Sequence, residues 1–258
     1  MPSPADRRPA DRRPSAQRDA APAPPGPPAF ANRAEAGVLL GAALREAIGE
    51  FKFGDDERPV VFAIPRGGVA VAAGVARQLN AALDLIVVRK IGHPGAPEFG
   101  LGAIAEGGEP VFDAVALAES GLAVTDLSEV VARERAELAR RVGVYCGASA
   151  LPSGLVPAPR AGERKPAAGL VIVVDDGLAT GVTARAALRA VRARGGGRVR
   201  TVLAVPVAAA NSLAAIKAEA DDVVTVVTSR RLHSVGEWYA DFGQLTDSDV
   251  LTLLAAAP

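Results

Sequence analysis

Cysteine is almost absent from this sequence. The single one among 258 residues, Cys146, excludes an internal disulfide, and no cysteine or histidine stands at metal-ligand spacing from it. We therefore expect Cys146 to be an ordinary thiol near the end of a helix, in a protein of a reducing compartment.

The sequence also lacks an excess of positive or negative charge, and it lacks long apolar runs. The 29 lysines and arginines balance 29 aspartates and glutamates, so the chain as a whole has no electrostatic preference for nucleic acid or for an anionic membrane. No apolar run approaches the roughly 18 residues that span a bilayer, and the N-terminus has no apolar signal segment. These absences predict a cytoplasmic protein without a nucleic-acid or membrane partner, in which any anion-binding site is local.

Large apolar side chains are missing from residues 1–29, apart from Met1. Proline, alanine, arginine and aspartate dominate this segment, and such a composition buries too little surface to offset the entropy of ordering. We predict a disordered tail at 1–29, followed by one folded domain at 30–258.

The rest of the chain alternates between short apolar runs and helix-forming stretches. Asn32 to Glu35 has the spacing of a helix-capping box and precedes a periodic stretch that ends near Glu50. The apolar runs are continuous, which is typical of parallel strands buried on both faces. The pattern predicts an α/β fold with a doubly wound, mainly parallel sheet. Its expected strands are 60–64, 85–88, 170–174, 201–205 and 223–228, and its expected helices are 69–79, 183–194 and 208–220.

An insertion separates the two halves of this pattern. Residues 101–112 have the pattern of a hairpin, residues 127–144 that of a charged helix, and residues 147–166 that of a loop rich in glycine and proline. The predicted fold therefore carries a small hairpin and helix insertion.

The stretch VIVVDDGLATGVT, residues 171–183, joins an apolar strand to two carboxylates and a loop of small residues. Ligands of open parallel sheets bind beyond the carboxyl ends of the strands, where Asp175 and Asp176 are expected. Gly177 and Gly181 allow tight backbone conformations, and successive N–H groups leading into a helix form a phosphate-sized nest. The carboxylates would repel a phosphate, so they need hydroxyl groups or a cation. A ribose 5-phosphate offers both kinds of group.

This stretch resembles the motif with which type I phosphoribosyltransferases bind phosphoribosyl pyrophosphate (PRPP). The resemblance implies that Asp175 and Asp176 hold the ribose hydroxyls and, directly or through water, Mg²⁺. A plain polar turn between strand and helix is the alternative interpretation, and a dinucleotide site is disfavoured because G-x-G-x-x-G is absent. The substrate-binding residues that the resemblance implies here are Asp175, Asp176, Gly177, Leu178, Ala179, Thr180, Gly181, Val182 and Thr183.

A second loop, Ile-Pro-Arg-Gly-Gly at 64–68, is similar to the one that holds pyrophosphate in this family. Pro65, Arg66, Gly67 and Gly68 follow an expected strand and open an expected helix. Backbone amides among glycines, with a guanidinium beside them, suit phosphate oxygens. An ordinary turn between strand and helix is again the alternative.

Arg89 and Lys90 precede the loop IGHPGAPEFG at 91–100. In the family a flexible loop near this place closes over pyrophosphate and brings a cation to the leaving group, so the resemblance implies Lys90 and Arg89 as catalytic candidates. Two solvated surface charges are the alternative. His93 and Glu98, in the same loop, receive no acid–base role.

Aromatic residues make up only 4% of the chain, yet Trp238, Tyr239 and Phe242 lie within five residues of one another. They would form a stacking wall for a flat acceptor base or dock the last helix on the sheet, and the sequence does not separate these alternatives. Purine-salvage members of the family commonly carry an aspartate where this loop has Ala179. Its absence lowers the expectation of hypoxanthine or guanine as the acceptor.

The resemblance covers about residues 30 to 250 and implies a Mg²⁺-dependent transferase with a C-terminal hood segment, here residues 230–244. Such an enzyme displaces pyrophosphate from PRPP and passes the ribosyl phosphate to a nitrogenous base, which the sequence does not identify. A noncatalytic regulatory protein that binds PRPP or a nucleotide is the open alternative, and a phosphoester hydrolase is disfavoured by the separate pyrophosphate loop. The resemblance is compatible with a homodimer without establishing one.

Overall fold

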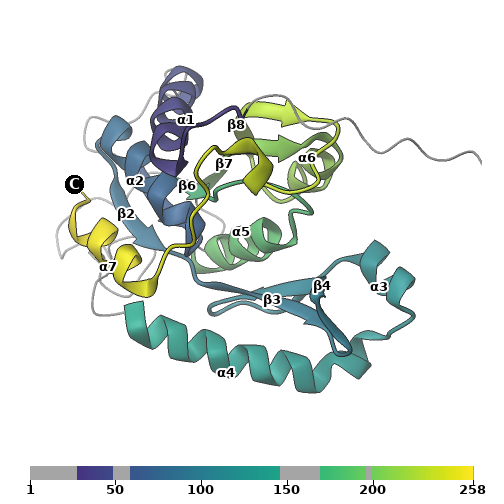
Figure 1. The fold of residues 1–258 in the computed structure, drawn as a ribbon. Coiled ribbons are helices and arrows are strands. Elements are labelled where there is room, and N and C mark those ends of the chain that lie inside the picture. The colour runs from purple at the N-terminus through teal and green to yellow at the C-terminus, as the bar shows by residue number, and fades with distance from the viewer. Residues whose placement is uncertain (1–27, 49–58, 146–168, 196–198, 258) are drawn as a thin grey trace, which may run out of the picture.

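The structure, a computed structural model, describes residues 28–48, 59–145, 169–195 and 199–257. A five-stranded parallel sheet forms its centre, and a three-stranded antiparallel sheet lies beside it (Figure 1). The central strands are β1 (Val60–Ala63), β2 (Ala82–Leu85), β6 (Leu170–Val174), β7 (Arg200–Ala209) and β8 (Asp222–Ser229), and the smaller sheet holds β3 (Val88–His93), β4 (Ala96–Ala105) and β5 (Val111–Phe112). The helices are α1 (Arg33–Ile48), α2 (Gly67–Leu79), α3 (Ala114–Ser120), α4 (Ser128–Tyr145), α5 (Val182–Gly195), α6 (Ala210–Ile216) and α7 (Asp247–Ala255), with short 3-10 turns at Val124–Leu127 and Gly236–Trp238.

The central sheet has the order β2-β1-β6-β7-β8, and all of its pairs are parallel. Alternate residues of one strand enter different cores: Ile172 packs with residues of α2, whereas Val173 packs with residues of α5. The sheet is therefore covered on both faces, which explains why its strands are apolar without alternation. The doubly wound, mainly parallel α/β fold is confirmed.

The first helix begins as the capping pattern predicts. The side-chain oxygen of Asn32 accepts a hydrogen bond from the Glu35 amide at 3.0 Å, and the Glu35 carboxylate accepts one from the Ala31 amide. α1 then crosses α2 closely, because a Cβ at Gly37 would lie 2.4 Å from the Val71 carbonyl oxygen. This close crossing fixes the start of α1 beside the carboxyl end of the sheet.

The prediction of a loop at 91–100 is wrong. Ile91 pairs with Gly102 and His93 with Ala96, so these residues form a β3–β4 hairpin that turns at 94–95. Hydrogen bonds between the two strands pair the backbone N–H and C=O groups of a segment for which the sequence predicted no regular structure. The predicted hairpin at 101–112 is confirmed as the pairing of β4 with β5.

The predicted strand at 85–88 is divided between two sheets, because Leu85 ends β2 and Val88 begins β3. The antiparallel sheet that starts at Val88 lies between α4 and α5 (Figure 1). The charged helix of the insertion is confirmed as α4, which runs along this sheet and ends near α7.

The predicted helix at 208–220 starts too early, because β7 continues to Ala209 and α6 covers only Ala210–Ile216. The extension has a physical cause. The Leu178 amide donates to the Val207 carbonyl at 2.8 Å, and the Ala209 amide donates to the Leu178 carbonyl at 2.8 Å. This bridge keeps the end of β7 extended beside the loop that follows β6.

Some sequence predictions fall outside the described residues. They concern Cys146, the loop at 147–166 and residues 1–27 of the tail. None of the helices that the structure describes combines the length and the apolar character needed to cross a membrane.

Candidate functional site

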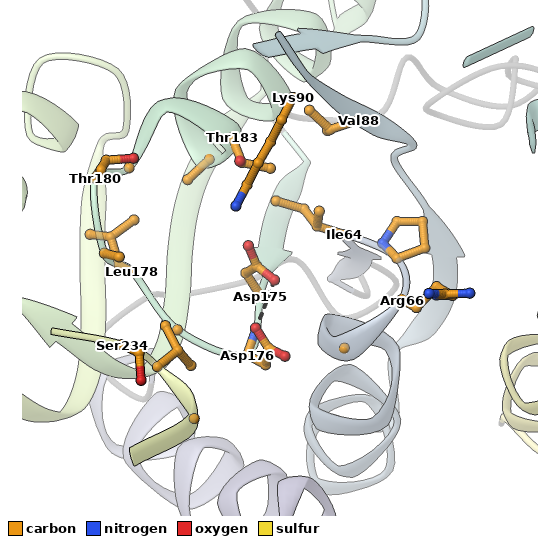
Figure 2. Close-up of a pocket in the computed structure, with 18 of the residues that line it drawn as sticks. Ile64, Arg66, Val88, Lys90, Asp175, Asp176, Leu178, Thr180, Thr183 and Ser234 are labelled. Carbon is orange, nitrogen blue, oxygen red and sulfur yellow. Dashed lines mark hydrogen bonds between the residues drawn. The ribbon is translucent and has the colours of Figure 1, made fainter. Parts of the chain in front are cut away.

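An open pocket of about 740 Å³ lies where β1 and β6 end side by side. The helices after these strands, α2 and α5, pack in different cores on opposite faces of the sheet. Strand ends whose connections diverge in this way leave a crevice, which is where open α/β sheets bind ligands. Figure 2 shows the side chains around this pocket, which come from the loops after β1 and β6, from β3, and from the hood segment at 230–244.

The two adjacent carboxylates that follow β6 have different environments. The Asp175 side chain accepts a hydrogen bond from the Asp176 amide at 2.9 Å and points toward Lys90 (Figure 2). Burial raises the pKa of Asp175 well above its ordinary value, and the Asp176 carboxylate raises it further, while the charges of Lys90 and Arg33 oppose this rise. Asp176 instead accepts a hydrogen bond from Arg33 Nε at 2.9 Å. The pocket therefore contains one carboxylate paired with a cation and one held close to a lysine.

The loop after the acids forms an anion nest that is shorter than predicted. The Leu178 amide is taken by the Val207 carbonyl, whereas the amides of 179–181 donate to no group in the described parts of the chain. Gly181 has a φ of +80°, a conformation that glycine adopts without strain. The first amides of α5 also lack helical partners. The nest therefore spans 179–183, and Val182 contributes only its backbone because its side chain lies in the core.

The loop after β1 approaches the acidic pair so closely that its glycines have no room for a side chain. A Cβ at Gly67 would lie 1.8 Å from Asp176 Oδ2, and one at Gly68 would lie 2.8 Å from the Val174 carbonyl oxygen. Pro65 and Gly67 both line the pocket, and the peptide bond between Pro65 and Arg66 is cis. The two predicted loops therefore come together, and glycine is what allows their contact.

We expect Gly67→Ala to disrupt this contact, because the new methyl group overlaps the carboxylate that Arg33 holds. Unfolding experiments should show a loss of about 1–3 kcal/mol from overpacking. Gly143→Ala is a matched control, since a Cβ at Gly143 meets nothing within 4 Å on the exposed side of α4, and it should leave stability unchanged or slightly higher. Equal stability of the two variants would contradict the close approach.

The predicted cations of the site point in different directions. Lys90 extends into the pocket above Asp175, whereas Arg66 points away from the acidic pair (Figure 2). Burial raises the pKa of Tyr145, at the end of α4, to about 12, and the Arg66 charge opposes this rise. Of these two cations, only Lys90 reaches toward the carboxylates.

Arg89 borders the pocket, but its guanidinium is held by α4. Its Nε and one terminal nitrogen donate to the same Glu134 oxygen at 3.0 and 2.8 Å. Neighbouring residues of a strand face opposite sides, so Arg89 anchors β3 on α4 while Lys90 faces the pocket. The catalytic role of Arg89 stays a prediction, and its side chain is engaged elsewhere in this structure.

Several residues line the pocket although no local sequence pattern indicates them. Arg33 comes from α1, Arg141 from α4, and residues 234–236 from the hood. Arg141 also pairs with Glu137 one turn earlier, at 2.9 Å, and this spacing alone is typical of a surface helix. No sequence signal marked either arginine, because each reaches the pocket only through tertiary packing.

The aromatic cluster docks the N-terminal segment rather than the last helix. The ring of Tyr239 lies between those of Phe30 and Phe242, with centroids 5.3 and 5.0 Å away. The Arg33 guanidinium lies 3.7 Å from the Phe242 centroid. The Tyr239 hydroxyl donates to the Asp176 carbonyl at 2.6 Å, and burial raises its pKa. These contacts favour docking over a stacking wall, although Phe242 also borders the pocket.

The fold and the pocket define a class of protein: a parallel α/β protein with an acidic pair and an anion nest facing one crevice, as suits a sugar phosphate. The family model of the phosphoribosyl transferase domain matches residues 37–241. The chain therefore belongs to the phosphoribosyl transferase domain family, and the resemblance seen in the sequence is confirmed.

The relatives agree with this assignment. Two proteins from Mycobacterium tuberculosis strains, both provisionally named phosphoribosyl transferases, are 35% identical to the chain over 229 residues. These matches cover 88% of this chain and 47% of theirs, so the chain spans about half the length of these relatives. The crystal structure of TT1426 from Thermus thermophilus matches with 38% identity and a TM-score of 0.66, covering 89% of this chain and 99% of that one.

Proposed function

We propose that the protein is a phosphoribosyltransferase that uses PRPP and transfers ribosyl phosphate to a nitrogenous base. The observation that carries this proposal is the shared pocket of Asp175, Asp176, the nest at 179–183 and Lys90. The carboxylates suit the ribose hydroxyls, and the nest suits the 5-phosphate. Family membership supports the transferase class, and the particular substrates belong to the proposal.

Mg²⁺ fits this donor set if it arrives with the substrate. The described residues contain no group of three or more histidine, cysteine, aspartate or glutamate side chains that could hold a metal ion. Mg²⁺ is commonly bound by one or two carboxylates together with substrate phosphates, which Asp175 and Asp176 would allow. The bound ion would neutralise charge on the pyrophosphate group.

The reaction that we propose breaks the bond between ribose C1 and the pyrophosphate oxygen, which keeps the electron pair. A bond then forms between C1 and a nitrogen of the acceptor, and the proton that this nitrogen carried leaves to solvent. In this scheme Lys90, which lines the pocket, neutralises the departing group, and the amide of Gly67 binds it. Gly68 packs against the acidic pair without lining the pocket. The acceptor would enter beside the hood, which offers Val235, Gly236 and the Ser234 hydroxyl.

Calorimetric titration with PRPP and Mg²⁺ tests the binding half of the proposal, with ribose 5-phosphate as a reference ligand. A panel of bases, followed by pyrophosphate release and mass spectrometry, tests the chemistry. We expect PRPP binding and one ribosylated product. Failure to bind millimolar PRPP would contradict the proposed function, and PRPP binding without product for any base would favour the noncatalytic regulatory alternative.

A further inference from the structure

Arg33 connects three parts of the chain that are distant in sequence. Its Nε donates to Asp176 Oδ2 at 2.9 Å, and its Nη1 donates to the Gly243 carbonyl at 2.8 Å. Its guanidinium also covers one face of the Phe242 ring, 3.7 Å from the centroid. One side chain therefore touches the acidic pair and the hood segment at the same time.

The backbone around Arg33 is fixed by the hood as well. The Phe30 amide donates to the Trp238 carbonyl at 3.0 Å, the Ala240 amide to the Phe30 carbonyl at 2.8 Å, and the Asp241 amide to the Ala31 carbonyl at 2.9 Å. The segment that leads into α1 and the hood therefore form one unit, and Arg33, the first residue of α1, extends from this unit into the pocket.

The ion pair is well shielded from water. The side chains of Arg33 and Asp176 are 12% and 18% exposed. An ion pair on the surface holds its side chains only weakly. Breaking a shielded, hydrogen-bonded pair is costly, because the remaining partner is left as an unpaired charge. The position of the Asp176 carboxylate therefore depends on Arg33.

We propose that Arg33 is a positioning residue, which orients the Asp176 carboxylate for the sugar ring and couples it to the docked position of the hood beside the pocket. The proposal rests on the proposed function, because the sugar ring is that of PRPP. Arg33 acts through Asp176 and makes no contact with the substrate in this scheme. An arginine suits this position because one planar, charged group serves the carboxylate, the carbonyl and the ring together, and its charge is the part that holds Asp176.

Arg33→Gln should weaken PRPP binding about tenfold, as expected for the loss of a charge-assisted hydrogen bond. Arg33→Lys keeps the charge without the planar fork and should lose only about threefold. Arg45→Gln is the matched control, since Arg45 is exposed on the same helix and, among the residues that the structure describes, bonds Gln78 away from the pocket. It should bind PRPP as the parent protein does. Equal losses for the glutamine and lysine variants would assign the effect to packing and overturn the proposal.

A double-mutant cycle with Asp176→Asn tests whether Arg33 acts through Asp176. The double variant should bind PRPP no more weakly than Asp176→Asn alone, and additive losses would overturn the proposal. Circular dichroism checks the fold of each variant. If Arg33→Gln unfolds, the cycle is measured with Arg33→Lys instead.

Fluorescence of Trp238, the chain's one tryptophan, tests the coupling without ligand. Its indole N–H is buried and has no hydrogen-bond partner among the residues that the structure describes, so release of the hood should shift its emission to the red. Arg33→Gln and Asp176→Asn should both produce the shift, and Arg45→Gln should not. Unshifted emission in the first two variants would overturn the coupling. If those two variants shift while the parent protein does not bind PRPP, the proposed function alone is refuted.

Discussion

Lys90→Gln should lower the single-turnover rate about 100-fold and change the PRPP dissociation constant much less. The lysine extends into the pocket above the acidic pair (Figure 2). Negative charge builds on the leaving oxygen only as the glycosidic bond breaks, so the interaction is strongest in the transition state. Loss of one such electrostatic contact typically costs about 10²-fold or more in turnover. Rapid-quench kinetics and calorimetry measure the two quantities separately, once an acceptor is known.

Lys217→Gln is the matched control for this experiment. Lys217 is exposed at the end of α6 and does not line the pocket, so its replacement should change neither quantity. Equal losses of rate and affinity in Lys90→Gln would assign Lys90 to uniform substrate binding. Unchanged values in both would leave it a surface charge.

Asp175→Asn should make the protein more stable and, at the same time, weaken PRPP binding at least tenfold. Burial raises the pKa of Asp175 in the folded protein. A folded-state pKa above the unfolded value means that stability is lost as the pH rises through the unfolded value toward the folded one. The neutral amide avoids this loss. A ribose hydroxyl would then meet a weaker acceptor, since hydrogen bonds to charged groups are the stronger ones.

Melting curves check this prediction. At pH 7 the variant should melt a few degrees above the parent protein, and the difference should shrink at pH 5, where the folded-state carboxyl is closer to neutral. Asp113→Asn is the control, because Asp113 caps α3 by accepting from two amides and asparagine caps helices equally well. A lower melting temperature for Asp175→Asn at pH 7 would contradict the environment described for this carboxyl.

Local patterns predicted most of the central strands and the acidic pair because both depend on contiguous residues. The run 170–174 ends where β6 ends, and the acids follow it directly. The partner of Asp176 was out of reach of such patterns, since 143 residues separate it from Arg33. A residue this distant is identified by tertiary packing alone.

The error at 91–100 has a more local cause. Its glycines and prolines suggested an irregular loop, yet 94–95 form a tight turn and Gly92 lies against Pro97, with room for no Cβ. The missed hairpin also explains why Arg89 and Lys90 were treated alike. Arg89 and Lys90 are neighbours on strand β3, so their side chains point to opposite sides of it. Arg89 therefore contacts α4, and Lys90 faces the pocket.

The two sides of the pocket differ in how firmly the central sheet holds them, because Leu178 is bridged to β7. Because Leu178 is bonded to Val207 and Ala209, the nest at 179–183 is an extension of a central strand, and mutations that move it would disturb the sheet. The hood residues 234–236 belong to no strand. Under the proposed function, changes at 234–236 would alter the acceptor while the sugar-phosphate half stayed the same, so exchanging these residues between relatives would test which part of the pocket selects the acceptor.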